Sequence, residues 1–385
     1  MSFEVDSISD GSTTVGLLPY GCTLESLVLS RPELNLHRDL VVGFQSPIHH
    51  HYSEGGRKFL NQVVGRYANR LPGGQVEFSS ACGARHLTLE GDDQDVCLHG
   101  GKQGFDTVDW VQVDDIEQSQ LFRTSDVANA NTWRMYKHSS AAGDDGFPNM
   151  LETEVLIRIS KSIDDNSRVA LIMRARLVQD ATSSSGKRDQ EPACPVNLTW
   201  HIGYNLADFS QADDVMTHKL FIDSDKTPQL DDKMLPTGTL LDIKPDDSLD
   251  FHSQGLSGPH RTIGHPFPPG GVDHNFVFKS VDTTKPQVVL TSPDDALTVR
   301  FRTNQSSVQC YTASGFDASA PLRKTIHDPR GAGPYPKYGA VFLEFQHPVA
   351  TFLHRALRDA AGTDTILTGH DIYENFVELE IVASR

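Results

Sequence analysis

The sequence predicts an all-β protein, and three observations carry the prediction. Apolar residues recur with a period of two over many short runs, as Val155, Ile157 and Ile159 do. Glycine, proline, asparagine or aspartate stands between many of these runs. The 3.6-residue periodicity of helices is almost absent, so the chain is expected to form mostly antiparallel β-structure with long connections.

The clearest strands are two neighbouring runs in the middle of the chain. In residues 154–160 apolar side chains alternate with polar ones such as Glu154 and Arg158, and residues 169–177 form a second alternating set. A strand that turns one face to the core and the other to solvent shows this pattern. Further strands are expected at 15–29, 108–113, 196–206, 275–279, 287–290, 296–302, 340–346 and 376–382.

The composition is that of a globular chain with a large core. Of the 385 residues, 38% are hydrophobic and 22% are charged, which excludes disorder as the overall state. Lys and Arg number 34 against 51 Asp and Glu, so the net charge is −17. Nucleic acid is therefore not an expected partner, because binding a polyanion needs a basic surface.

The sequence shows no signal for a membrane or for export. No run approaches about 18 consecutive apolar residues, and the start, MSFEVDSISDGSTT, carries acids where a signal peptide has a basic region. We expect a cytoplasmic protein that does not bind membranes, with residues 1–12 flexible. The five cysteines are scattered and form no CxxC pair, which argues against a disulfide framework and a zinc site: Cys22, Cys82, Cys97, Cys194 and Cys310.

Three segments have the composition of surface loops, namely 138–149, 180–195 and 252–272. Each could border a binding site, and 252–272, rich in proline, glycine and histidine, is the first choice. None interrupts the strand pattern long enough to force a domain boundary.

Several catalytic motifs are absent from the sequence. It contains no GxGxxG after a strand, no GxxxxGK[ST], no GxSxG and no HExxH, so dinucleotide, P-loop, serine-hydrolase and zincin chemistry have no motif support. The run from His49 to His51 is interpreted as a solvated loop patch, because no carboxylate or cysteine stands at ligand spacing beside it.

Five separated motifs resemble, in order and spacing, those of the aldose 1-epimerase (galactose mutarotase) family. The resemblance runs from about residue 13 to the end of the chain. Its motifs are GRYANR (65–70), HGGKQGFDTVDW (99–110), NLTWHIGYNL (197–206), GVDHNF (271–276) and YGAVFLEFQ (338–346), accompanied by VQCYT (308–312).

The resemblance implies one large antiparallel β-sandwich domain over residues 1–385, with a sugar site in a cleft on one sheet. It implies interconversion of the α and β anomers of free aldohexoses, with no cofactor and no metal, by a monomer or a homodimer whose partner is a small sugar. The family's general base falls on Glu344 and its general acid on His201. Its substrate-orienting residues fall on Asn69, Arg70, His99, Asp273 and Gln309.

Chemistry supports the same acid and base. Mutarotation needs a base for the anomeric hydroxyl and an acid for the ring oxygen, and a carboxylate and a histidine can serve near pH 7. Period two places His201 and Gly203 on the cleft face of their strand, opposite apolar side chains. Glu344 shares its face with Phe342 and Gln346, opposite three apolar residues.

The chain departs from the family pattern beside the acid. Trp200 stands where the family usually has Asn, and Gly203 stands where it has an aromatic residue. A missing ring beside His201 should leave a void that admits bulkier sugars, unless a neighbour fills it. The segment HPVATFLH after LEFQ also departs from the family's usual sequence.

Other interpretations remain open. A hexose-6-phosphate epimerase would need extra cations at the phosphate, a glycosidase could use Asp273 and Glu344 as its two carboxylates, and a sugar-binding module would not turn over. Taken singly, Asp273 could bond amides in a turn and Arg70 could be an ion-pair partner.

Overall fold

The computed structural model describes residues 3–51, 57–80, 83–91, 95–178, 191–317, 319–369 and 371–384. Within these ranges strands predominate, and the only α-helices are α1 (Thr124–Val127) and α2 (Arg355–Ala361). The all-β prediction is confirmed. No helix in the described ranges is long and apolar enough to cross a membrane.

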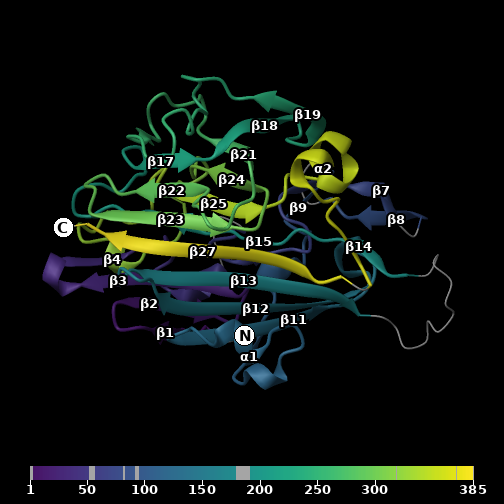
Figure 1. The fold of residues 1–385 in the computed structure, drawn as a ribbon, viewed down its shortest axis with the longest axis horizontal. Coiled ribbons are helices and arrows are strands. Elements are labelled where there is room, and N and C mark those ends of the chain that lie inside the picture. Colours follow the sequence, from purple (N-terminus) through teal and green to yellow (C-terminus); the bar gives the residue numbers. More distant parts are fainter. Residues whose placement is uncertain are drawn as a thin grey trace.

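The larger of two main sheets has nine strands, all paired antiparallel, in the order β10-β11-β12-β13-β27-β23-β22-β17-β20 (Figure 1). Its centre is regular because β12 and β13 pair along their whole length without a register shift. The strands are β10 (Val111–Val113), β11 (Thr132–Ser140), β12 (Met150–Lys161), β13 (Ser167–Val178), β27 (Tyr373–Ala383), β23 (Leu297–Thr303), β22 (Val288–Thr291), β17 (Lys219–Ile222) and β20 (Arg261–Thr262).

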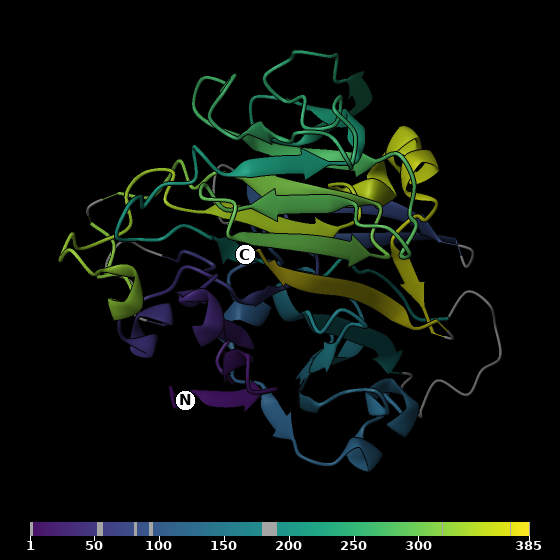
Figure 2. The same ribbon diagram turned by 60° about the vertical axis from the view of Figure 1, so that its left-hand side comes forward.

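The second main sheet has six strands in the order β16-β25-β24-β21-β18-β19. Figures 1 and 2 show it lying over the β22–β23 end of the nine-stranded sheet, with α2 beside β19. The strands are β16 (Gly203–Tyr204), β25 (Val341–Gln346), β24 (Ser307–Tyr311), β21 (Asp273–Phe278), β18 (Ser224–Leu230) and β19 (Pro236–Asp242).

The two main sheets pack face to face through large apolar side chains. Phe301 on β23 is fully buried and lies 5.2 Å from Tyr204 and 5.3 Å from Phe345, measured between ring centroids. Burial of an aromatic ring of this kind contributes roughly 1.5–3 kcal/mol to stability. One continuous apolar core joins the sheets, so the predicted antiparallel sandwich is confirmed.

Four smaller strand pairs lie outside these sheets, and two of them, β5–β15 and β6–β9, adjoin or contain motif residues. The pairing of β5 with β15 places the GRYANR segment against the strand before His201. The pairs are β5 (Val63–Val64) with β15 (Thr199–Trp200), β6 (Arg70–Pro72) with β9 (Val96–Leu98), β7 (Gly74–Ser80) with β8 (Gly83–Leu89), and β14 (Ala193–Pro195) with β26 (Ile366–Thr368).

The N-terminal segment differs from expectation. Part of residues 1–12, predicted to be flexible, is a strand, β1 (Asp6–Ser9), which pairs with β2 in the register Asp6↔Leu17. Alternation there is too short to stand out in the sequence. A four-stranded sheet follows, in the order β1-β2-β3-β4, with β2 (Thr13–Leu18), β3 (Thr23–Arg31) and β4 (Leu36–Asp39).

The three predicted loops are only partly loops. Residues 138–140 end β11, and the rest of 138–149 crosses to β12. In 180–195, residues 180–190 lie outside the described ranges, while Ala193–Pro195 form β14. The segment 252–272 links β19 to β21 and contains β20.

Candidate active site

All seven candidate site residues line one pocket of about 410 Å³ beside the six-stranded sheet. This volume falls in the usual range of small-molecule sites, roughly 300–1,000 Å³. Four aromatic side chains line it, namely Phe59, Tyr311, Phe316 and Phe342. The candidate residues it brings together are Asn69, Arg70, His99, His201, Asp273, Gln309 and Glu344.

Strand register explains why three of these residues meet. Gln309 on β24 is paired directly with Glu344 on β25, and Tyr311 is paired with Asp273 on β21. Residues opposite each other in an antiparallel pair share a face, so the two carboxylates and the amide project to the same side. The alternate residues Leu343 and Phe345 belong to the core, as period two predicts.

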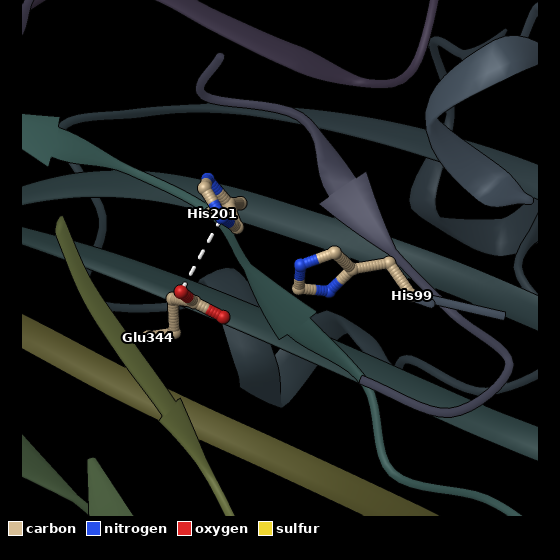
Figure 3. Close-up of side chains that lie close together, drawn as sticks. All are labelled: His99, His201 and Glu344. Atoms are coloured by element: carbon tan, nitrogen blue, oxygen red, sulfur yellow. Dashed lines mark ion pairs between the residues drawn. The ribbon is translucent and has the colours of Figure 1, made fainter. Parts of the chain in front are cut away.

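His201 lies at a kink between two short strands, β15 and β16. The Ile202 amide donates to the Trp200 carbonyl at 3.0 Å, which closes a three-residue turn around His201. The predicted continuous strand 196–206 is therefore interrupted. His201 Nε2 lies 3.3 Å from Glu344 Oε1 (Figure 3), and both side chains are almost completely buried.

His99 and Asn69 are joined by two hydrogen bonds, one between their backbones and one to the His99 ring. The His99 amide donates to the Asn69 carbonyl at 2.9 Å, and the Asn69 amide donates to His99 Nδ1 at 3.2 Å. Both residues have positive φ, +51° and +65°, so both backbones occupy the left-handed region. Figure 3 shows one ring nitrogen of His99 facing His201 and Glu344.

This contact sets the protonation of the neutral His99 ring. Because Nδ1 accepts a hydrogen bond, the proton sits on Nε2, and His99 acts as a donor there. His99, His201 and Glu344 offer ligand-type atoms within 4.8 Å of one another, as a metal site would. A metal-bound histidine donates from its second nitrogen, whereas His99 accepts, so the trio does not fit a metal ion.

In the described part of the chain, Asp273 does not cap a turn and Arg70 is not an ion-pair partner, the structural roles that each could have had when considered singly. Asp273 Oδ1 accepts a hydrogen bond from Gln309 Nε2 at 2.7 Å, not from the amides of a turn. The Arg70 side chain forms no hydrogen bond or ion pair with any residue that the structure describes. Its guanidinium is therefore available to a ligand in the pocket.

Two buried acceptors in the pocket also lack partners. Within the described ranges, Glu344 Oε2 and Gln309 Oε1 have no hydrogen-bond donor. An unmet buried acceptor costs roughly 1–3 kcal/mol, so native proteins rarely leave one without a ligand or water. A ligand rich in hydroxyl groups would satisfy both.

Known proteins resemble this chain over most of its length. The sequence model of the family described as aldose 1-epimerase matches residues 5–352. The chain belongs to the aldose 1-epimerase family. It is 26% identical to an aldose 1-epimerase of Escherichia coli (strain K12) over 344 residues, covering 87% of this chain and 83% of that protein. It is also 26% identical to a galactose mutarotase of Mus musculus over 337 residues, covering 87% and 82%.

Solved structures show the same fold. An aldose epimerase homologue from C. elegans superposes with a TM-score of 0.76 at 20% identity, and the match covers 99% of each chain. A galactose 1-epimerase from Lactobacillus acidophilus gives a TM-score of 0.68 at 17% identity, covering 99% of this chain and 95% of that one. The galactose mutarotase type of sandwich is thus confirmed.

Burial controls the charge of the His201–Glu344 pair. Desolvation raises the pKa of Glu344 well above its usual value, the negative charge of Asp273 raises it further, and Arg70 opposes both. Desolvation lowers the pKa of His201 to about 4, against backbone groups of His201 and Phe59 that raise it. The pKa of His99 is lowered chiefly by burial. The free pocket therefore favours a neutral pair that shares one proton.

The expected void beside Gly203 does not exist. A Cβ at Gly203 would lie 2.8 Å from both the Phe342 ring and Val42, so neighbours already fill the space. Gly203 pairs with Phe342 across β16 and β25, and the Phe342 ring lies 4.8 Å from the His201 ring. An aromatic side chain from the adjacent strand therefore fills the space beside Gly203.

Two other expectations are wrong. None of the residues of 252–272 lines the pocket; several of them line a separate cavity with Phe221 and Asp250. The histidine run is not a solvated patch, because His50 Nε2 contacts Glu25 at 2.7 Å and its side chain is buried. Sequence reasoning also missed Phe59, whose ring lies 4.6 Å from His99 and whose only signal was its place just before the GRYANR motif.

Proposed function

We propose that the protein interconverts the α and β anomers of free aldohexoses, with Glu344 as base and His201 as acid, as a single domain without a cofactor. The observation that carries the proposal is the buried pair of His201 Nε2 and Glu344 Oε1, 3.3 Å apart in a pocket with unmet acceptors. The anomeric and ring oxygens are bonded to the same carbon. An acid and a base this close can reach both oxygens at once.

The reaction moves two protons and returns them. Glu344 takes the proton of the anomeric hydroxyl while His201 gives one to the ring oxygen, and the C1–O5 bond breaks. After rotation about C1–C2 the open aldehyde recloses on its other face, His201 recovers its proton, and Glu344 gives its proton back to the oxygen on C1. Each group contributes roughly 10²–10⁴ in rate, or about 3–5 kcal/mol.

The charge state of the pair suits this cycle. The ionised pair and the neutral pair carry the same single proton, so one converts to the other without exchange with solvent. The neutral pair, favoured by burial, is the state the two groups reach when the sugar ring is open. Burial therefore stabilises the middle of the cycle relative to its start.

The other pocket residues supply both kinds of hydrogen-bonding group. Arg70, the side-chain amide of Asn69 and His99 Nε2–H donate, while Asp273 and Gln309 Oε1 accept. Every hydroxyl of a hexose both donates and accepts, so such a mixed lining suits a sugar. We propose that these five residues orient the ring over the acid–base pair.

One observation favours a second substrate class. Lys58 lines the pocket and forms no ion pair with any described residue, so it could receive a phosphate. Proton exchange spectroscopy on equilibrated glucose, galactose and glucose 6-phosphate measures anomer exchange for each sugar in one format. The proposal expects faster exchange with the free sugars. Acceleration confined to the phosphate, and weakened by salt, would move the assignment to aldose phosphates; no acceleration with any sugar would reject both.

A further inference from the structure

The kink at His201 is held by a residue from a distant part of the chain, Asn61. Asn61 is fully buried and has φ of +62°, an unusual conformation for a residue with a side chain. Its amide donates to the His201 carbonyl at 2.9 Å, and the His201 amide donates to the Gln62 carbonyl at 2.9 Å. Residues 61 and 62 thus hold the His201 backbone on both sides.

The side chain of Asn61 extends this hold past the kink. Its Oδ1 accepts from the Gly203 amide at 3.0 Å, and its Nδ2 donates to the Val42 carbonyl at 2.5 Å. In a regular ladder a backbone carbonyl would meet the Gly203 amide. Here the chain has turned away at His201, and the Asn61 side chain replaces that carbonyl.

Trp200 completes the arrangement from the residue just before the acid. Its indole Nε1–H donates to the Asn61 carbonyl at 2.9 Å, and the ring is buried in the core. This Trp is the position where the chain departs from the Asn usual in the aldose 1-epimerase family. The departure therefore has a structural partner in Asn61.

We propose that Asn61 and Trp200 act as one positioning unit, which fixes the His201 imidazole against Glu344 for proton transfer. The inference rests on the proposed function, but the hydrogen bonds that join Asn61, Trp200 and the His201 backbone do not depend on it. Neither residue lines the pocket, so neither touches the sugar. Their effect should appear in turnover and in the titration of His201 rather than in sugar binding.

A purely structural role is the competing explanation, and the chain supplies a matched control for it. Trp110 is equally buried, and its indole Nε1–H donates to the Phe105 carbonyl at 3.1 Å. Trp110→Phe removes the same type of bond and the same ring volume as Trp200→Phe, away from the His201 kink. Asn61→Gly removes the side-chain bonds while keeping a backbone that tolerates positive φ.

The experiment compares wild type with Trp200→Phe, Asn61→Gly, the double variant and Trp110→Phe. Anomer exchange gives kcat and KM, and NMR of ring-labelled histidine gives the titration of His201. We expect kcat to fall about 10- to 100-fold in each single variant, with KM within about threefold of wild type. The double variant should lose little more than the worse single variant, because the two residues act as a unit. Trp110→Phe should leave kcat and the His201 titration unchanged.

Three results would contradict the proposal that Asn61 and Trp200 position His201. They are an unchanged His201 titration in both single variants, equal changes in Trp110→Phe, and losses that multiply fully in the double variant. If the wild-type protein does not accelerate anomer exchange, the proposed function fails. The NMR titration still tests whether Asn61 and Trp200 position His201. A Trp200→Phe protein that does not fold leaves Asn61→Gly to carry the same test.

Discussion

The polar faces of the two main sheets differ in how their charges are satisfied. On the nine-stranded sheet, Arg302 lies 3.0 Å from Glu378 and 3.2 Å from Glu380, and Arg168 lies 3.3 Å from Glu380. These are cross-strand pairs of opposite charge, which stabilise a solvated sheet face. Most charges on this face are therefore paired, although Arg168 Nε has no hydrogen-bond partner within the described ranges.

The cleft face of the six-stranded sheet is polar but incomplete. Within the described ranges, Glu344 Oε2, Gln309 Oε1 and both amide atoms of Gln346 are buried without hydrogen-bond partners. Of these residues, Glu344 and Gln309 line the pocket, where hydroxyl groups of a ligand or water can reach their free acceptors, whereas Gln346 does not line it. Buried polar atoms without partners also occur elsewhere in the part of the chain that the structure describes, as at Thr153 and Asn375, so the cleft face is distinguished by having such atoms beside an open pocket.

The largest expected effect is a loss of activity on substitution of a residue on the cleft face of the six-stranded sheet. Glu344→Gln keeps the shape of the side chain but removes the proton acceptor, so the rate of anomer exchange should fall roughly 10²–10⁴-fold. Circular dichroism should show an unchanged fold. Retention of more than about a tenth of wild-type activity would show that Glu344 is not the base.

The pH dependence tests the shared proton. The active pair carries one proton, so activity should fall on the acid side as a second proton binds, near the His201 pKa of about 4. On the alkaline side it should fall as the last proton leaves, at the raised pKa of Glu344. In His201→Asn only Glu344 titrates, so the remaining activity should rise through that pKa. A His201→Asn profile that keeps the wild-type alkaline fall would contradict this assignment.

A change in packing beside His201 should have an intermediate effect, on stability. Gly203→Ala places a Cβ 2.8 Å from Phe342 and Val42, so the free energy of unfolding should drop by about 1–3 kcal/mol. Urea denaturation measures the change. Unaltered stability with tighter binding of hexoses would instead indicate the open pocket expected from the sequence.

The smallest expected effect is a change in stability on substitution of a residue on the polar face of the nine-stranded sheet. Arg302→Gln removes two ion pairs of a network that keeps Arg168 and Arg300, so stability should fall by about 0.5–1 kcal/mol at most, and less in high salt. Activity should stay at the wild-type level. A large loss of turnover would break the contrast between a structural face and a functional one.

The regular sheet was predictable and the details of the site were not. Alternation alone predicts 154–160 and 169–177, and the structure extends each run by a few residues into β12 and β13. The resemblance to aldose 1-epimerases supplied His201 and Glu344, and period two gave their faces. The local sequence pattern is enough to predict a strand where its hydrogen bonds follow a continuous ladder.

The kink at His201 and the filling of the Gly203 space escaped prediction because both depend on partners far away in sequence. Asn61 reaches residues 201 and 203 through hydrogen bonds that no spacing rule encodes. Phe342 fills the space beside Gly203 only because the register of β16 and β25 pairs them. No turn joins β16 to β25, which lie far apart in sequence, so local sequence does not reveal their register.

Polarimetry of freshly dissolved α-D-glucose and α-D-galactose tests the central claim most directly, with protein dialysed against EDTA. The account predicts a first-order rate of rotation change that rises in proportion to protein concentration, saturates with sugar and is the same before and after EDTA. A rate equal to that of buffer with both sugars, from protein shown to be folded, would contradict it; so would activity lost with EDTA and restored by a divalent ion.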